Sequence, residues 1–172
     1  MPLHLTLKGE IAVKSGLDLL DRRIIRLLQQ DGRVPAADIA RQLQVSERTV
    51  RNRIVRMREQ GAVLPTLVVN PKYFGYQMAV DVFCEVDMAR MQEVGSALGQ
   101  LPEVNYVAYS TGDQDISIQA VLESSDAVYE FVQRLTSIPG IKRTRTVLVP
   151  RILKDTYQWI PPETAFEEYE GT

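Results

Sequence analysis

Apolar side chains recur every three or four positions between residues 17 and 58, the period of an amphipathic helix. The pattern predicts three helices. The first begins at Asp18, whose carboxylate can cap it, and runs to about Gln30. A second, shorter helix begins near Pro35, and a third runs from a Ser46 cap to Gly61. The positions expected to be buried are Leu17, Leu20, Ile24, Leu27 and Leu28, then Ile39, Ala40 and Leu43, then Val50, Ile54 and Met57.

The second and third predicted helices are separated only by Gln44 and Val45. Two short helices joined by such a tight turn form a helix-turn-helix. Glycine is common in this turn and Gln44 takes its place here, while the small Ala40 allows the two helices to approach closely. The third helix is crowded with arginine, which suits a helix that lies in a DNA major groove. Taken alone, that helix could also be a solvated basic surface.

Side chains off the apolar stripe of the third helix are the candidate DNA contacts. Arginine can bond to O6 and N7 of guanine and asparagine can pair with adenine, so some of these side chains are expected to read base edges. Others are expected to contact phosphates, which fix the register of a protein on DNA. We assign base edges to Glu47, Arg48, Arg51 and Asn52, phosphates to Thr49, Arg53 and Arg56, and the N-terminal cap to Ser46.

After residue 61 the pattern changes from helical to mixed. The apolar stretch 62–69 is interrupted by Pro65, which predicts an edge strand or a linker, and residues 70–76 read as a turn and domain boundary. Alternating strand patterns and helical patterns then follow to residue 155. The expected strands are 77–87, 104–110, 115–122 and 141–153, and the expected helices are 88–101 and 126–137.

The order βαββαβ predicts a ferredoxin-like domain, so the chain is expected to be an α+β protein of two domains. Both helices of that arrangement cover one face of the sheet and leave the other face free. A free face with apolar positions usually packs on a second sheet, so we expect at least a homodimer. Residues 1–16 and 156–172 show no sustained period and are expected to be tails, the second of them frayed and acidic beyond Pro162.

The charge of the chain is unevenly distributed. Residues 18–61 carry ten arginines against six acidic residues, whereas the remainder carries ten basic residues against sixteen acidic ones. A basic module on an acidic body favours local contact with phosphates. A single cysteine, Cys84, excludes an internal disulfide and fits a reducing cytoplasm, and no apolar run is long enough to span a bilayer.

Several short motifs occur in an order that resembles the Lrp/AsnC family of prokaryotic transcription regulators. They are Leu17–Ile24, Asp31–Arg33, Thr49-Val50 with Arg53, Asn70-Pro71 with Phe74–Tyr76, Thr111–Asp115 and Gly140–Thr146. The resemblance implies a helix-turn-helix (winged-helix-like) domain at 17–61, a hinge at 62–76 and a ferredoxin-like (RAM) domain at 77–155. It also implies double-stranded DNA operators, small effectors that are often amino acids, and dimers that assemble into octamers or similar rings.

The segment Thr111-Gly112-Asp113-Gln114-Asp115 joins the two central strands and is the candidate effector site. Gly112 permits a positive φ, and a turn of this kind offers backbone N–H groups to a carboxylate. Asp113 or Asp115 could meet an α-amino group. The family resemblance places effectors near this turn at a subunit contact, with Thr144 and Thr146 as candidate wall residues. An ordinary hairpin turn whose aspartates bond to backbone is the competing interpretation.

Nothing in the sequence predicts catalysis. Siroheme decarboxylases are similar to this family in fold and depend on histidine, but the one histidine, His4, lies in the predicted N-terminal tail. No metal-ligand cluster, nucleophile–base pair or phosphate loop is present, so no cofactor is expected. An effector-sensing protein without DNA binding remains the alternative function, and the intact arginine set of the third helix argues against it.

Overall fold

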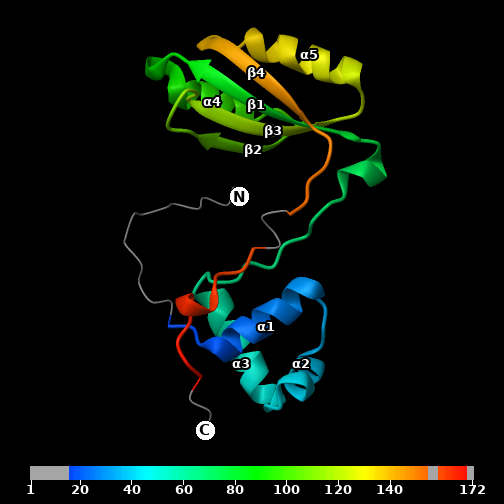
Figure 1. Ribbon diagram of the computed structural model, residues 1–172, viewed down its shortest axis with the longest axis vertical. Helices are drawn as coiled ribbons and strands as arrows, with labels where there is room; N and C mark the ends of the chain where they lie inside the picture. Colours follow the sequence, from blue (N-terminus) through cyan, green and yellow to red (C-terminus); the bar gives the residue numbers. More distant parts are fainter. Residues whose placement is uncertain (1–15, 155–158, 170–172) are drawn as a thin grey trace. The chain divides into compact units, whose positions relative to one another are not determined.

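The computed structural model describes residues 16–154 and 159–169. They divide into two compact units (Figure 1). One unit comprises the chain up to Leu67 together with the stretch from Lys154 onward, and the other comprises Val68–Leu153. Apart from Gly16, the predicted N-terminal tail lies outside the described residues, as does His4.

The first unit contains three helices, α1 (Leu19–Gln30), α2 (Ala36–Leu43) and α3 (Glu47–Glu59), as the sequence predicts. The α1 N-terminus is a capping box, in which Asp18 accepts from the Asp21 N–H and Asp21 accepts from the Asp18 N–H. The predicted apolar stripes meet in one core. Its fully buried members are Leu17, Leu20, Ile24, Ile39, Ala40, Val50 and Met57.

The turn between α2 and α3 depends on a left-handed residue. Gln44 has φ 57° and ψ 41°, the conformation for which glycine is usual, and the next amide, that of Val45, donates to the Ala40 carbonyl at 3.1 Å. Ser46 then accepts from the Thr49 N–H at 3.0 Å and starts α3. The turn and the cap together fix where α3 begins.

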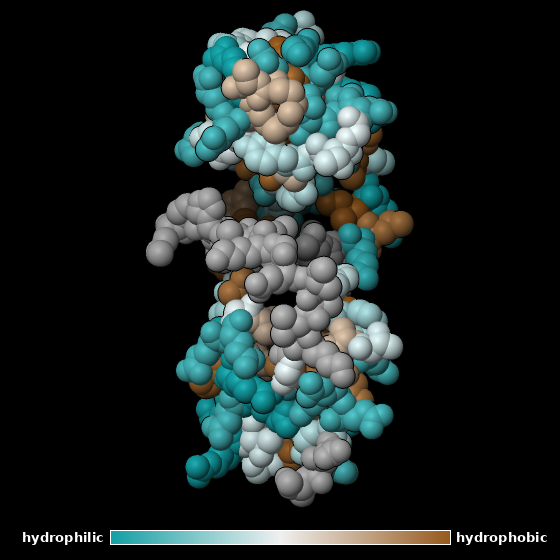
Figure 2. Space-filling model, turned by 90° about the vertical axis from the view of Figure 1, so that its left-hand side faces the viewer, coloured by the Kyte–Doolittle hydropathy of each residue, from teal (hydrophilic) through white to brown (hydrophobic). Residues whose placement is uncertain are grey.

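In the described residues no strand forms between α3 and the 3-10 turn at Pro71–Phe74, so residues 62–69 run as a linker within this chain. Pro65 removes a donor from this stretch, and several of its apolar side chains are exposed, as the brown surface at mid-height in Figure 2 shows. They include Leu64, Leu67, Val68 and Val69.

The C-terminal stretch corrects the sequence interpretation most. Residues 163–172 were expected to fray, but residues 159–169 lie on the first unit, where Phe166 and Tyr169 pack against its core. A short 3-10 turn, η4 (Glu163–Ala165), occurs within this stretch. The stretch lacks a helical or strand period because its order comes from tertiary contacts.

The second unit is the predicted βαββαβ domain. Its strands are β1 (Met78–Val86), β2 (Val104–Tyr109), β3 (Ile116–Leu122) and β4 (Ile141–Val149), paired antiparallel in the order β2-β3-β1-β4. A 3-10 turn, η2 (Met88–Arg90), leads into α4 (Met91–Gly99), and α5 (Ser125–Thr136) follows β3. Strand β4 ends four residues earlier than predicted, directly before Pro150.

Both helices pack on one face of this sheet. Val94 and Leu98 of α4 and Phe131 and Leu135 of α5 join alternate residues of β1 and β3 in a second buried core. The opposite face has no covering element among the described residues of this unit. It presents the other set of alternate residues, among them Asp81, Phe83, Glu85, Arg143, Arg145 and Val147.

Candidate nucleic-acid interface and effector site

The predicted base-reading side chains lie together on the exposed side of α3. Glu47, Arg48, Arg51 and Asn52 are all exposed, while Val50 and Met57 are buried on the opposite side. Arg48, Arg51 and Asn52 follow the spacing of one helix face, and Val55, half exposed, continues it one turn on. Val55 is absent from the predicted contacts, although its spacing of three and four from Asn52 and Arg51 places it on the same face.

Two of the exposed side chains are already paired with each other. Arg51 Nη2 lies 2.5 Å from Glu47 Oε1 in an i,i+4 ion pair, with Arg51 Nε at 2.8 Å from the same oxygen. Both side chains are largely in solvent, so the pair is worth only about 0.3–0.5 kcal/mol and can be exchanged for a base contact. It holds the Arg51 guanidinium against Glu47 at the N-terminal end of α3.

Arg53 and Arg56, predicted to contact phosphates, instead point toward α1. Arg53 Nη1 lies 2.7 Å from Asp18 Oδ2 and 2.9 Å from Asp21 Oδ1, and Arg56 Nη2 lies 2.5 Å from Asp21 Oδ2. The Asp21 side chain is fully buried, so it depends on these partners. Helical spacing does not reveal partners on another helix, which is why the sequence analysis missed this network.

The network shifts the ionisation of its members. Burial alone raises the pKa of Asp18, but the Asp21 N–H and the Arg53 guanidinium bond to the carboxylate and leave its pKa below the ordinary 3.8. Burial lowers the pKa of Arg53, but its bonds to the Asp18 and Asp21 carboxylates outweigh burial and raise the pKa overall. Arg56 keeps 43% of its side chain exposed and Arg53 only 16%, so Arg56 and the half-buried Thr49 have the freer access to a phosphate.

The predicted effector turn joins β2 to β3. Gly112 adopts φ 137°, as the sequence predicts, and Thr111, Gly112 and Asp113 are exposed. Asp115 holds the backbone instead: its Oδ2 accepts from the Val86 N–H at 2.8 Å, and its own N–H donates to the Cys84 carbonyl at 3.0 Å. The competing interpretation, an aspartate bonded to backbone, therefore describes Asp115, whereas the Asp113 carboxylate is open to solvent.

A cavity of about 280 Å³ adjoins this turn and is lined by Asp113, Gln114, Arg143 and Arg145. The two arginines extend from β4, and the guanidinium of Arg145 lies 4.7 Å from the centre of the Phe83 ring. Arg143 and Arg145 are absent from the predicted site residues, although their alternation with Thr144 along β4 places the two arginines on one face. The cavity thus combines a carboxylate, an amide and two guanidinium groups.

The other predicted wall residues lie on a different side of the sheet. Thr144 is opposite Cys84 and Thr146 is opposite Val82 in the β1–β4 ladder, so both share the face covered by α4 and α5. Both are half-buried. The structure therefore does not bring Thr144 and Thr146 together with the cavity-lining arginines.

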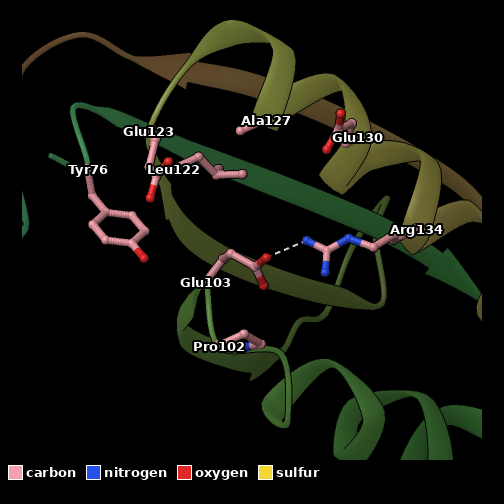
Figure 3. A pocket seen from close by; sticks show the side chains of 8 residues that line it. All are labelled: Tyr76, Pro102, Glu103, Leu122, Glu123, Ala127, Glu130 and Arg134. Atoms are coloured by element: carbon pink, nitrogen blue, oxygen red, sulfur yellow. Dashed lines mark hydrogen bonds and ion pairs between the residues drawn. The ribbon is translucent and has the colours of Figure 1, made fainter.

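A second cavity, of about 260 Å³, lies between the start of β2 and α5 (Figure 3). Glu103 and Arg134 form an ion pair across it, and Glu123 and Glu130 lie at its rim. Burial raises the pKa of Glu103, but the bond and charge of Arg134 together with a backbone N–H outweigh burial and lower the pKa overall. Glu103 is already paired with Arg134. The groups of this cavity that remain for a ligand are mainly the Glu123 and Glu130 carboxylates and the Tyr76 ring.

No three histidine, cysteine, aspartate or glutamate side chains converge as metal ligands in the described part of the chain. Cys84 is buried in β1, and that burial raises the pKa of its thiol to about 11, which leaves it protonated and unreactive. Within residues 16–154 and 159–169, no helix is long and apolar enough to cross a membrane.

Known proteins share both parts of this chain. Residues 17–58 match the AsnC-type helix-turn-helix domain and residues 78–159 match the Lrp/AsnC ligand binding domain. The HTH-type transcriptional regulator FL11 of Pyrococcus furiosus is 35% identical over 141 residues, covering 81% of this chain and 93% of that protein. FL11 of Pyrococcus abyssi is 34% identical over 145 residues, covering 84% and 96%.

Solved structures show the same fold. AsnC of E. coli has a TM-score of 0.75 at 27% identity and covers 82% of this chain and 98% of its own. The regulator NMB0573 of Neisseria meningitidis, solved as a complex with L-Met, has a TM-score of 0.77 at 22% identity, covering 84% and 96%.

The fold and the basic helix α3 thus define a transcription regulator with one DNA-binding and one ligand-binding domain. Most of the chain matches the two domains of a single family. The chain belongs to the Lrp/AsnC family of transcriptional regulators.

Proposed function

We propose that α3 enters the major groove and reads bases through Glu47, Arg48, Arg51 and Asn52, with Val55 against a thymine methyl group. The shared exposed face of these side chains carries the proposal. Thr49 and Arg56 contact phosphates at the edge of the groove, and Ser46 keeps the first turn of α3 intact. Arg53 contributes by holding α3 against α1, which replaces the phosphate contact expected from sequence.

The cavity beside the 111–115 turn is our proposed effector site. Asp113 pairs with an ammonium group, and Arg143 or Arg145 pairs with a carboxylate, which is the polar pattern of a free α-amino acid. Thr111, Gly112 and Gln114 complete the rim. NMB0573, which shares the fold, binds L-Met, so amino acids are the first ligands to test.

We further propose that the uncovered sheet face forms a homodimer and that dimers assemble into larger rings. Aromatic, acidic and basic side chains alternate on this face, so a two-fold axis could bring Asp81 or Glu85 of one copy against Arg143 or Arg145 of the other. The protein is a regulator without catalytic activity and works in the cytoplasm, where its DNA is.

The DNA proposal is tested on a duplex that the wild-type protein selects from a random-sequence pool. Arg51→Ala should reduce the preference for that duplex over a scrambled one by about 1–3 kcal/mol, because a bidentate base contact is lost. Arg56→Ala should weaken both duplexes alike and flatten the salt dependence, and it should also destabilise the first unit because Asp21 loses a partner. Arg23→Ala, which removes an exposed arginine of α1, serves as control.

Competition binding at two salt concentrations separates these outcomes. If Arg51→Ala and the control lose preference equally, α3 does not read the bases. Selection of no duplex by the wild-type protein would remove the DNA proposal altogether.

The effector proposal is tested by isothermal titration of the twenty free amino acids into the full-length protein. One or more should bind with measurable heat, and Asp113→Ala should abolish that heat because the ammonium group loses its partner. Glu130→Ala alters the second cavity and should leave the heat unchanged. Absence of heat with every amino acid, or loss of heat in the control, would reject the site.

A further inference from the structure

The C-terminal stretch of residues 161–169, called the clasp below, lies beyond both regions that match the family. Its backbone is fixed to the start of α1. The Leu19 N–H donates to the Glu167 carbonyl at 2.9 Å, and the Glu167 N–H donates to the Leu17 carbonyl at 2.8 Å. These two bonds make a short parallel bridge at Asp18. The clasp therefore binds the residues that immediately precede and cap α1.

Side chains continue the contact along α1. The Arg22 side chain, only 11% exposed, donates from Nε to the Pro161 carbonyl at 3.3 Å and lies 2.8 Å from Glu163 Oε1. Phe166 and Tyr169 are half-buried against the core formed by the three helices. Nearly complete burial of an arginine on a surface helix indicates an ordered contact, since a frayed end would leave it in solvent.

Tyr169 connects the clasp to α3. The Arg53 guanidinium carbon lies 5.2 Å from the centre of the Tyr169 ring, within the range of a cation–π contact. The same guanidinium pairs with Asp18 and Asp21 at the start of α1. Arg53 is thus held by the two carboxylates and the aromatic ring at once, and its position sets where α3 lies on α1.

We propose that the clasp is a third part of the DNA-binding unit and that Tyr169 is a positioning residue for α3, acting through Arg53. Tyr169 does not itself read DNA. The inference rests on the assignment of α3 as the recognition helix. The clasp also carries acidic residues, which could instead repel DNA. The same experiment detects that opposite role.

The test uses the full-length protein and the duplex selected by the wild type. Tyr169→Leu keeps an apolar side chain but removes the ring, and should lower the affinity about threefold to tenfold, the range of a cation–π contact of about 0.7–1.4 kcal/mol. Tyr169→Phe keeps the ring and should bind as the wild type does. Rescue by phenylalanine distinguishes the ring contact from the hydroxyl.

A second pair of variants addresses the backbone bridge. Glu167→Pro removes the N–H that donates to Leu17 and should lower the affinity, whereas Glu167→Ala keeps that N–H and should not. Hydrogen exchange of the Leu19 amide, measured without DNA, reports whether the clasp is bound in each variant. Slow exchange of the α3 amides in the same experiment shows that the unit is still folded.

Several outcomes overturn the inference. Unchanged affinity in Tyr169→Leu with a released clasp shows that the clasp has no part in DNA binding, and increased affinity shows that it opposes DNA. Fast exchange at Leu19 in the wild-type protein shows that the contact is absent, whether or not a duplex is selected. If the wild-type protein selects no duplex but Leu19 exchanges slowly, the clasp contact is present. The DNA-reading role of α3 is then rejected, and the positioning role of Tyr169 is rejected with it.

Discussion

At the scale of single residues, charge pairs decide how α1 and α3 meet. Asp21 is fully buried, and two guanidinium groups compensate its charge. Removing a partner from such a network leaves a buried charge uncompensated, which costs far more than breaking an exposed pair like that of Glu47 and Arg51. Arg53 therefore fixes α3 on α1 and Arg48 and Arg51 remain available for DNA, while Arg56 pairs with Asp21 and keeps 43% of its side chain exposed.

Asp18 makes the stability of the first unit dependent on pH. Its pKa lies below the ordinary 3.8 in the folded protein, so the ionised form stabilises the fold. That contribution is complete above 3.8 and is lost as the pH falls through the lower folded-state pKa. Asp18→Asn should lower stability by about 1–2 kcal/mol at neutral pH, because the amide still caps α1 but lacks the charge that pairs with Arg53.

Urea unfolding of both proteins, followed by far-UV circular dichroism from neutral pH down to about pH 2.5, measures this effect. The wild-type and variant curves should converge as the pH falls. Curves that stay parallel throughout would show that the Asp18 carboxylate does not supply the pH dependence.

At the scale of elements, the sequence predicts helices and strands where the signal is local. Ser46, the stripe of Val50, Ile54 and Met57, and the strand alternation around Cys84 each specify an element without reference to the rest of the chain. The clasp could not be predicted in this way, because Phe166 and Tyr169 are ordered by contact with a core that is formed more than a hundred residues earlier.

In the candidate sites too, some features follow from local sequence and others from tertiary contacts. Exposure of Arg48, Arg51 and Asn52 follows from helical spacing, and the positive φ of Gly112 follows from residue type. The pairing of Arg53 with Asp18 and the face occupied by Thr144 depend on tertiary packing and strand register. A one-residue difference in register exchanges the two faces of a strand, so Thr144 and Arg145 could not be assigned from sequence alone.

The α2–α3 turn yields a prediction at this scale. Gln44 is held in a left-handed conformation, which costs a non-glycine residue about 1–2 kcal/mol, while glycine costs about 0.5–1 kcal/mol in chain entropy. Gln44→Gly should therefore raise the stability of the first unit by up to about 1 kcal/mol, and the β-branched Gln44→Val should lower it. Thermal unfolding of both variants checks this, and a destabilised glycine variant would contradict it.

At the scale of the whole molecule, the uncovered sheet face predicts the assembly. Phe83→Asp places a charge at the centre of this face and should convert the protein to monomers, which sedimentation velocity detects. Tyr129→Asp changes an exposed residue of α5 and should leave the assembly intact. A dimeric Phe83→Asp protein would show that the interface lies elsewhere.

Loss of the dimer should also affect DNA binding. Two copies of α3 related by a two-fold axis bind half-sites about one helical turn apart, or a multiple of it. The monomeric variant should therefore bind a duplex with two half-sites no better than a duplex with one.

Because residues 161–169 pack on α1, stretches from near both ends of the sequence belong to a single folding unit. A fragment that stops after residue 61 would leave the contact surface of Phe166 and Tyr169 open to water, and the complementary fragment would carry those two aromatic rings with nothing to cover them. An affinity tag placed C-terminal to the clasp is expected to disturb operator affinity more than its size alone suggests, because the clasp contacts Arg22 of α1 and Arg53 of α3.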